Sequence, residues 1–166
     1  MTDMLIKLYA LPPFEPLLQS ALRQGVAVRR AMVYEQRHLA SWISDAFNDQ
    51  WADECRAAFC RQPVCCYLAL KEQVLCGFCC YDCTYRGFFG PIGVRTDVRA
   101  KGLGTALLLA ALNAMHAMGY AYAIVGNAGA TEFFKKAAGA IEIADSVPGA
   151  YPETMRWMKD TSKHVL

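Results

Sequence analysis

The segment at residues 98–105, VRAKGLGT, combines the residue types that bind a phosphate group. Gly102 and Gly104 would let a ligand approach the backbone closely, while the preceding cations and the Thr105 hydroxyl would pair with phosphate oxygens. An apolar run follows and predicts a helix, whose first N–H groups and positive dipole end would face the same ligand. The pattern therefore predicts a phosphate-binding loop that opens a helix.

Two common nucleotide-binding motifs do not fit this loop. A Walker loop requires the order G-x-x-x-x-G-K-[ST], whereas here Lys101 precedes Gly102. A dinucleotide-binding fingerprint requires G-x-G-x-x-G, and Leu107 stands where the third glycine would be. Both motifs are therefore excluded.

Hydrophobic periodicity predicts the elements that position the loop. Apolar residues at helical spacing over residues 34–62 predict two helices, separated by the capping pair Asn48-Asp49. This order of elements predicts an α/β fold, with a mixed sheet and helices on its faces. The other expected elements are strands at 5–9, 26–34, 64–71, 74–83, 87–94, 122–126 and 140–146 and helices at 15–23, 103–118 and 131–139.

Three strands in succession are expected just before the loop. The runs at 64–71 and 74–83 are joined only by Glu72-Gln73, which predicts an antiparallel hairpin. The third run, GFFGPIGV at 87–94, contains glycine and proline residues that a regular central strand disfavours. We therefore expect a bulge or an unpaired stretch there.

Residues 103–125 carry no charge and are long enough to suggest a membrane span. Polar residues interrupt the run, however, and Gly119-Tyr120 separates a helix-like half from a β-rich half. The sequence therefore favours a buried helix followed by a buried strand, and no membrane partner.

The overall composition is that of a single cytoplasmic domain. The net charge of +2 gives no indication of a nucleic-acid partner, and the 55% hydrophobic content excludes a disordered chain. The N-terminus lacks the features of a secretory signal. We expect one domain over residues 1–166, with its core at about 26–147, an N-terminal extension at 1–25, and a C-terminal loop or strand and tail at 148–166.

Eight cysteines lie between residues 55 and 83. Cys76-x-x-Cys79 and Cys80-x-x-Cys83 have the spacing of zinc ligands, but both pairs fall in an expected strand. Residues three apart on a strand point to opposite faces, so neither pair would chelate one ion locally. We therefore favour small apolar packing residues and no metal, with a metal site or redox pair as the alternative.

Arg99-x-x-Gly102-x-Gly104, placed after a distorted strand and at the start of a helix, resembles the acetyl-CoA loop of the GCN5-related N-acetyltransferases (GNAT). The resemblance extends over roughly residues 26–147. It implies a mostly antiparallel central sheet with two splayed strands that admit the cofactor. It also implies that the backbone of Ile92, Gly93 and Val94 pairs with the pantetheine arm and polarises the thioester carbonyl. The implied pyrophosphate cradle is Arg99, Ala100, Lys101, Gly102, Leu103, Gly104 and Thr105.

The resemblance leaves the catalytic residues open. Asn127 would lie at the lip of the cofactor gap, where a turn or cap is the alternative role. Many relatives carry a proton-donating tyrosine in the helix at 131–139, but here the matching position beside the cofactor falls on Phe134, or on Lys135 if counted back from Gly139. Tyr151 is the first candidate for a replacement acid, with water as an alternative. Asp82 and, less favoured, Glu132 are the candidate bases, although each also fits a turn or helix-cap role.

The expected function is an acetyl-CoA-dependent N-acetyltransferase, in which an amine attacks the bound thioester directly. The alternative is a non-catalytic acyl-CoA-binding or sensing domain of the same fold, which the phenylalanine at position 134 favours. The acceptor would be a small-molecule or peptide amine, and it is not identified by any motif. Dimerisation is common among such folds, so a homodimer is also considered.

Overall fold

The computed structural model describes residues 1–98 and 102–151 of the 166-residue chain. The strands are β1 (Met4–Lys7), β2 (Val26–Arg30), β3 (Cys66–Lys71), β4 (Val74–Tyr81), β5 (Phe89–Val94), β6 (Tyr122–Val125) and β7 (Ile141–Glu142). The α-helices are α1 (Glu15–Arg23), α2 (Gln36–Ala46), α3 (Asp49–Ala58), α4 (Leu103–Ala117) and α5 (Thr131–Ala138).

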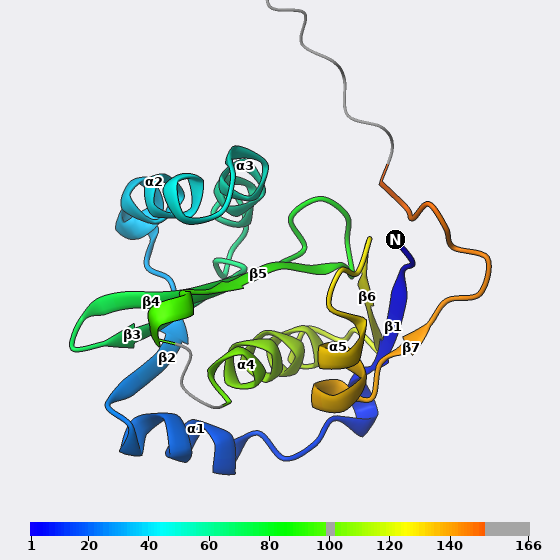
Figure 1. Cartoon of the computed structure of the whole chain (residues 1–166), viewed down its shortest axis with the longest axis horizontal. Coiled ribbons are helices and arrows are strands. Elements are labelled where there is room, and N and C mark those ends of the chain that lie inside the picture. The colour runs from blue at the N-terminus through cyan, green and yellow to red at the C-terminus, as the bar shows by residue number, and fades with distance from the viewer. Residues whose placement is uncertain (99–101, 152–166) are drawn as a thin grey trace, which may run out of the picture.

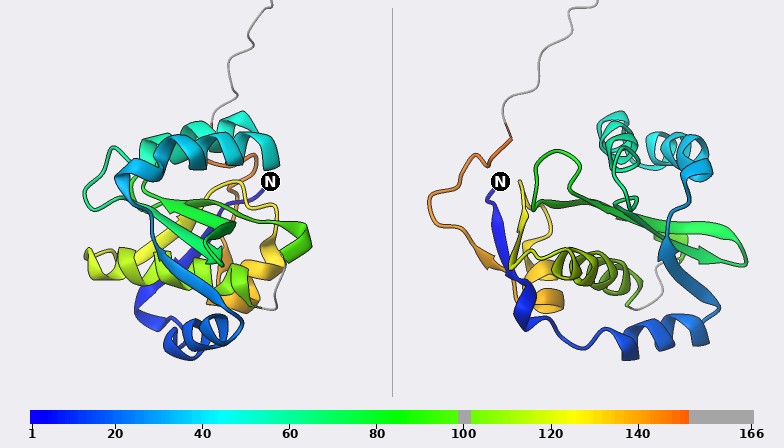
Figure 2. Two further views of the ribbon diagram at one scale, coloured as in Figure 1. Left: turned by 90° about the vertical axis from the view of Figure 1, so that its left-hand side faces the viewer. Right: turned by 180° about the vertical axis from the view of Figure 1, so that it is seen from behind.

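The strands form two antiparallel sheets that meet at one point. The larger sheet has the order β2-β3-β4-β5 and the smaller has the order β6-β1-β7. A parallel bridge between Phe88 and Ile124 joins them. Helices α2 and α3 cover one face of the larger sheet, while α4 and α1 lie on the other (Figures 1 and 2). The expected α/β fold with helices on both faces is confirmed.

Helix α4 forms the centre of the core. Its side chains are apolar around most of the circumference, and Leu107, Leu108, Leu109 and Leu112 are fully buried between the sheets and the neighbouring helices. The helix ends before β6, so the uncharged run divides into a buried helix and a strand as expected. Among the described residues, no helix combines the length and the apolarity needed to cross a membrane.

The hairpin and the distorted strand are both confirmed. Glu72 and Gln73 adopt positive φ angles of 50° and 64°, as a tight hairpin turn requires, and β3 pairs with β4 on either side. The pairing of β4 with β5 shifts between Cys79 and Tyr81, opposite Gly90-Pro91. This irregularity bends β5 at the point where it begins to leave β6.

Two terminal strands differ from the expectation. The N-terminal extension contributes β1, which lies between β6 and β7 with Met4 and Ile6 fully buried, so it belongs to the core. The last strand, expected at 140–146, is limited to Ile141–Glu142. The next residue still donates its N–H to the Asp3 carbonyl at 2.9 Å, but Asp145 at φ 57° then turns the chain away from β1.

Candidate active site

A V-shaped gap opens where β5 and β6 diverge. The Ile124 N–H donates to the Gly87 carbonyl at 2.9 Å, which holds the strands together at one end. Beyond this contact, β5 pairs with β4 and β6 pairs with β1, so the two strands belong to different sheets. The splayed pair expected from the sequence is therefore confirmed.

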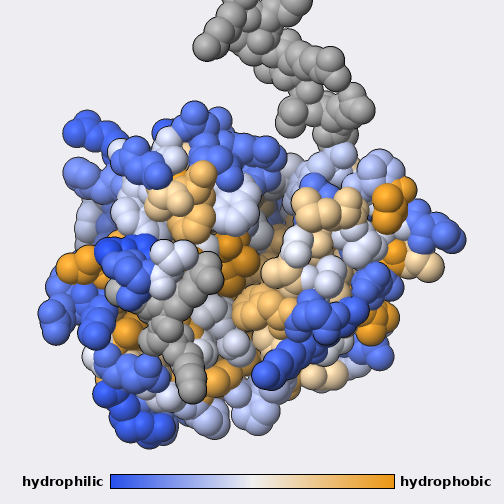
Figure 3. Space-filling view, in the orientation of Figure 1, coloured by the Kyte–Doolittle hydropathy of each residue, from blue (hydrophilic) through white to orange (hydrophobic). Residues whose placement is uncertain are grey.

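The gap contains a cleft of about 420 Å³. Its walls come from β5, from the segment after β6 and from the side of α3 that faces the gap. Figure 3 shows a hollow with apolar surface between the part of the molecule built on the larger sheet and the part that contains β6 and α5. The lining residues are Met1, Gln50, Trp51, Glu54, Phe89, Gly90, Pro91, Ile92, Val125, Gly126, Asn127, Ala128, Gly129, Ala130, Phe134 and Tyr151.

The edge of β5 that faces the gap presents backbone hydrogen-bonding groups. Arg95 donates its N–H to the Cys76 carbonyl at 2.9 Å, which sets the alternation of bonds between β5 and β4. Gly93 therefore bonds toward β4, while the N–H groups of Ile92 and Val94 point to the opposite edge. An extended ligand could pair with this edge as an added strand would.

The predicted phosphate cradle lies at the start of α4. Gly102 is the N-cap residue and adopts φ 95°, a left-handed conformation that other residues rarely adopt. The first turn that follows includes Leu103, which is buried, and Thr105, which is partly exposed. Arg99, Ala100 and Lys101, the other predicted cradle residues, lie outside the described residues. Residues 102–105 of the predicted cradle therefore form a helix N-terminus, which is a typical phosphate-binding feature.

The packing of the protein itself does not require a glycine at position 104. A Cβ at this position would lie 3.6 Å from the Phe133 ring and 4.0 Å from Val94, which are ordinary contact distances. Because Val94 ends β5 and Phe133 lies in the first turn of α5, Gly104 lies beside both elements. The geometry therefore fits a ligand that passes from β5 to the helix start and approaches the backbone closely.

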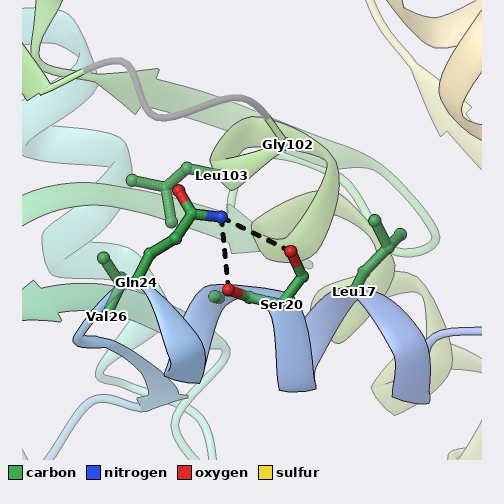
Figure 4. A pocket seen from close by; sticks show the side chains of 7 residues that line it. Leu17, Ser20, Gln24, Val26, Gly102 and Leu103 are labelled. Atoms are coloured by element: carbon green, nitrogen blue, oxygen red, sulfur yellow. Dashed lines mark hydrogen bonds between the residues drawn. The ribbon is translucent and has the colours of Figure 1, made fainter.

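A second pocket lies on the other side of the helix start. Figure 4 shows α1 running beside the beginning of α4, with Leu17 and Gln24 turned toward it. Its volume of about 20 Å³ leaves room for about one water molecule, so it would not hold a cofactor. Gln24 also donates to the Ser20 carbonyl at 3.2 Å, which keeps its side chain over α1. This pocket is a packing feature that supports the loop.

Tyr151 lies in the cleft, as the acid hypothesis requires. Its ring stacks on Tyr85 at a centroid distance of 5.9 Å and packs edge-on against Phe88 at 6.0 Å. Gly126 lies directly against the ring, where a Cβ would come within 2.7 Å. Burial, with the Glu54 carboxylate nearby, raises the pKa of Tyr151 to about 12. The phenol is therefore protonated, and able to give up a proton, throughout the neutral range.

Glu54, which sequence reasoning did not select, lies in the same cleft. It is half-buried on α3, one turn after Trp51, and burial raises its pKa above that of an ordinary glutamate. Thr84 donates its hydroxyl to Glu54 Oε1 at 2.9 Å, and the same hydroxyl interacts with Tyr151. Glu54 and Tyr151 are thus linked through one threonine. Only the position of Glu54 on the helix face of Trp51 could have suggested it from the sequence.

The two carboxylates selected from the sequence lie elsewhere. Asp82 is buried and does not line the cleft; it accepts hydrogen bonds from the Gly87 N–H at 2.7 Å and from the Tyr120 hydroxyl at 2.9 Å. Both carboxylate oxygens of Asp82 are therefore engaged in holding a turn. Glu132 is exposed and pairs with Lys135 at 3.0 Å. This placement favours the structural roles considered for both.

Asn127 and Phe134 lie in the cleft wall, where the resemblance placed them. Asn127 adopts φ 52° at the lip and donates its backbone N–H to Asp3 Oδ1 at 2.7 Å. The other Asp3 oxygen accepts the Ala150 N–H at 2.8 Å. Asp3 is itself buried, so one carboxylate from β1's N-terminal side ties together the two loops that carry Asn127 and Tyr151.

Comparison with known proteins agrees with this geometry. A model of the acetyltransferase (GNAT) family matches residues 36–140, whereas no curated protein sequence matches the chain. The GCN5-related glucosamine N-acetyltransferase region of a fungal multi-domain GH3 beta-N-acetylglucosaminidase is similar, with a TM-score of 0.70 at 11% identity over 86% of this chain and 19% of that one. A GCN5-related N-acetyltransferase from Sphaerobacter thermophilus gives a TM-score of 0.60 at 20% identity, over 86% of this chain and 48% of that one. This chain thus spans less than half of either protein, and the similarity concerns the fold.

Proposed function

We propose that this chain, which belongs to the acetyltransferase (GNAT) family, transfers the acetyl group of acetyl-CoA to an amine. One observation carries the proposal: the cleft between β5 and β6 combines an open strand edge with the side chains of Glu54 and Tyr151, and the helix start with Gly104 lies beside the end of β5. The pantetheine arm would pair with Ile92 and Val94, and the pyrophosphate would lie on the first turn of α4 at Gly102 and Gly104. This path ends with the thioester near Glu54 and Tyr151.

The linked pair would move the protons of the reaction. As the amine nitrogen bonds to the carbonyl carbon, Glu54 accepts the proton that the nitrogen gives up. As the carbon–sulfur bond breaks, the sulfur takes a proton from the Tyr151 phenol. Thr84, which donates to Glu54 and lies close enough to Tyr151 to influence its pKa, would return the proton from Glu54 to Tyr151. A backbone N–H on the open edge of β5, such as that of Ile92, would stabilise the negative charge on the carbonyl oxygen.

The cleft also indicates the kind of acceptor. Trp51 offers an aromatic surface and Glu54 a carboxylate, one helical turn apart, which suits a molecule that arrives as a protonated amine and releases one proton to solvent before the neutral nitrogen attacks. The acceptor would therefore be a small molecule or a peptide end with a primary amine.

The test is release of free thiol from acetyl-CoA across a panel of small and peptide amines. We expect thiol release that depends on the amine, with the acetylated amine as the product by mass spectrometry. Phe134, which lines the cleft where many relatives carry a tyrosine, favours a second candidate, an acyl-CoA-binding domain without turnover. Tight acetyl-CoA binding without amine-dependent thiol release across the panel would support that candidate and reject the transferase.

A further inference from the structure

Three cysteines from separate elements converge under α3. Cys55 lies on α3, Cys66 on β3 and Cys80 on β4, and their sulfur atoms all lie within 4.8 Å of one another. Cys66 and Cys80 are direct partners in the pairing of β3 with β4, so their side chains share the sheet face that α3 covers. Cys79, next along β4, faces α4 instead, where its thiol contacts the Leu107 carbonyl at 3.2 Å. The cluster is fully buried, with each of its three residues 0% exposed.

A fourth thiol, that of Cys83, lies near this cluster but outside it. Strand β4 ends at Tyr81, and Asp82 adopts φ 54°, so the chain turns before Cys83. The turn keeps Cys83 near Cys80, but its thiol donates to the Tyr81 carbonyl at 3.5 Å and lies outside the 4.8 Å group. Cys83 would reach an ion bound at Cys80 only by leaving the Tyr81 carbonyl and turning its side chain toward the cluster. Cys83 is partly exposed and gives the cluster a route to solvent.

The donor set is entirely sulfur. The ligand atoms of the group are the three Sγ atoms of Cys55, Cys66 and Cys80, all of them buried. Among the described residues, no histidine, aspartate or glutamate belongs to this group of potential ligands. Cysteine sulfur binds soft ions such as zinc, whereas magnesium and calcium prefer oxygen ligands.

We propose that Cys55, Cys66 and Cys80, completed by Cys83, form a binding site for a thiophilic divalent ion of the zinc class. Tetrahedral zinc with Zn–S bonds of about 2.3 Å places its sulfurs roughly 3.8 Å apart, so the three core thiols need to move inward by about 1 Å at most. Each cysteine that ligates the ion releases its proton to solvent. The ion would join α3 to the β3–β4 hairpin and thereby hold the helix that carries Trp51 and Glu54 into the cleft.

The test is titration of the metal-free protein, reduced with a phosphine, first with Co(II) and then with Zn(II). We expect one Co(II) per chain, a sulfur-to-cobalt charge-transfer band and the visible bands of tetrahedral cobalt, all lost when Zn(II) displaces it. Zn(II) should also raise the melting temperature. C83S alters the partly exposed ligand and should weaken zinc binding at least about tenfold without unfolding the protein.

The matched control is C76S, because Cys76 is buried on the same strand but lies outside the cluster. This variant should bind Co(II) with the spectrum and affinity of the unmodified protein. The absence of a charge-transfer band in the unmodified protein would overturn the site. Equal zinc affinity of C83S and the unmodified protein would overturn the assignment of the fourth ligand.

Discussion

At the scale of single residues, Glu54 is the side chain whose chemistry depends most on its surroundings. Burial raises its pKa, while Thr84 and Tyr151 connect its carboxylate to a second proton-transfer group. A base with a raised pKa binds protons more strongly than a surface carboxylate does. Asp82, by contrast, has its two oxygens engaged by Gly87 and Tyr120.

The variant E54Q tests this role. Removal of a general base typically lowers the rate about 10²–10⁴-fold, and we expect a loss of that order in kcat/KM with little change in acetyl-CoA affinity. The activity of the unmodified protein should rise with pH through a pKa above that of a free glutamate, and E54Q should lack this step. D53N, on the exposed side of the same helix, is the control and should keep full activity.

The same substitution has an opposite effect on stability. Because the folded-state pKa of Glu54 is raised, its contribution to stability is present below the unfolded pKa and is lost as the pH rises through the folded pKa. Glutamine has no charge to desolvate, so the free energy of unfolding of E54Q should equal or exceed that of the unmodified protein at neutral pH. Urea unfolding at acid and neutral pH measures the difference. A variant that is inactive and also less stable at neutral pH would contradict a purely catalytic role.

Gly104 gives an independent test of the cofactor path. Alanine fits the protein at ordinary contact distances and is a better helix residue than glycine, so G104A should fold with unchanged or slightly higher stability. Its methyl group would occupy the space through which a phosphate approaches the helix start. We therefore expect acetyl-CoA affinity, measured by calorimetry, to fall at least about tenfold, a loss of roughly 1.4 kcal/mol. Unchanged affinity would place the cofactor elsewhere.

At the scale of elements, the N-terminal side of β1 holds two loops of the cleft as well as the smaller sheet. Asp3, just before β1, accepts the N–H of Asn127 through one oxygen and that of Ala150 through the other. These loops carry the lip of the cleft and Tyr151. The position of Tyr151 in the cleft therefore depends on a residue more than 140 positions away in sequence.

D3N should loosen both loops. The amide keeps one acceptor but points an N–H₂ group at a backbone donor, and a buried donor left unsatisfied costs about 1–3 kcal/mol. We expect the free energy of unfolding to fall by this amount and kcat to fall with it, because Tyr151 is no longer held. D145N, an exposed carboxylate in the same C-terminal segment, is the matched control. If D3N and D145N behaved alike in denaturant unfolding and in activity, the proposed clamp would be rejected.

Features set by neighbouring residues could be predicted from the sequence, whereas features set by contacts between distant segments could not. Residues 98–105 were informative because a strand, glycines and a helix start are local features, and the Glu72-Gln73 turn fixed the hairpin for the same reason. Glu54 could not be found this way, because its burial depends on Thr84 and Tyr151 from distant loops. The strand expected at 74–83 ends at Tyr81, because Asp82 adopts a left-handed conformation that local sequence does not reveal.

At the scale of the whole molecule, the cleft lies between two sheets that share one bridge. A ligand in the gap would contact β5 of the larger sheet and the segment after β6 of the smaller one. Binding would therefore stabilise the relative placement of the two sheets. The position of β1 in the smaller sheet could not be predicted, because a strand of four residues does not indicate its neighbours.

Acetyl-CoA binding should accordingly increase the free energy of unfolding. A ligand at about 100 times its Kd stabilises a protein by roughly 2.7 kcal/mol, and for a chain of this size about 2–4 °C per kcal/mol is expected. The melting temperature should rise by roughly 5–10 °C with acetyl-CoA at that concentration. Adenosine or free pantetheine alone should produce a smaller shift, because each would occupy only part of the path. No shift at saturating acetyl-CoA would contradict binding between the sheets.

The most direct measurement is a crystal structure of the protein bound to CoA. The account predicts the pyrophosphate at the first turn of α4 beside Gly102 and Gly104, and the pantetheine arm along the open edge of β5 at Ile92 and Val94. The thiol should lie in the cleft within reach of Tyr151, with Glu54 on the acceptor side. CoA bound outside the gap between β5 and β6, or with its thiol turned away from Glu54 and Tyr151, would contradict the account.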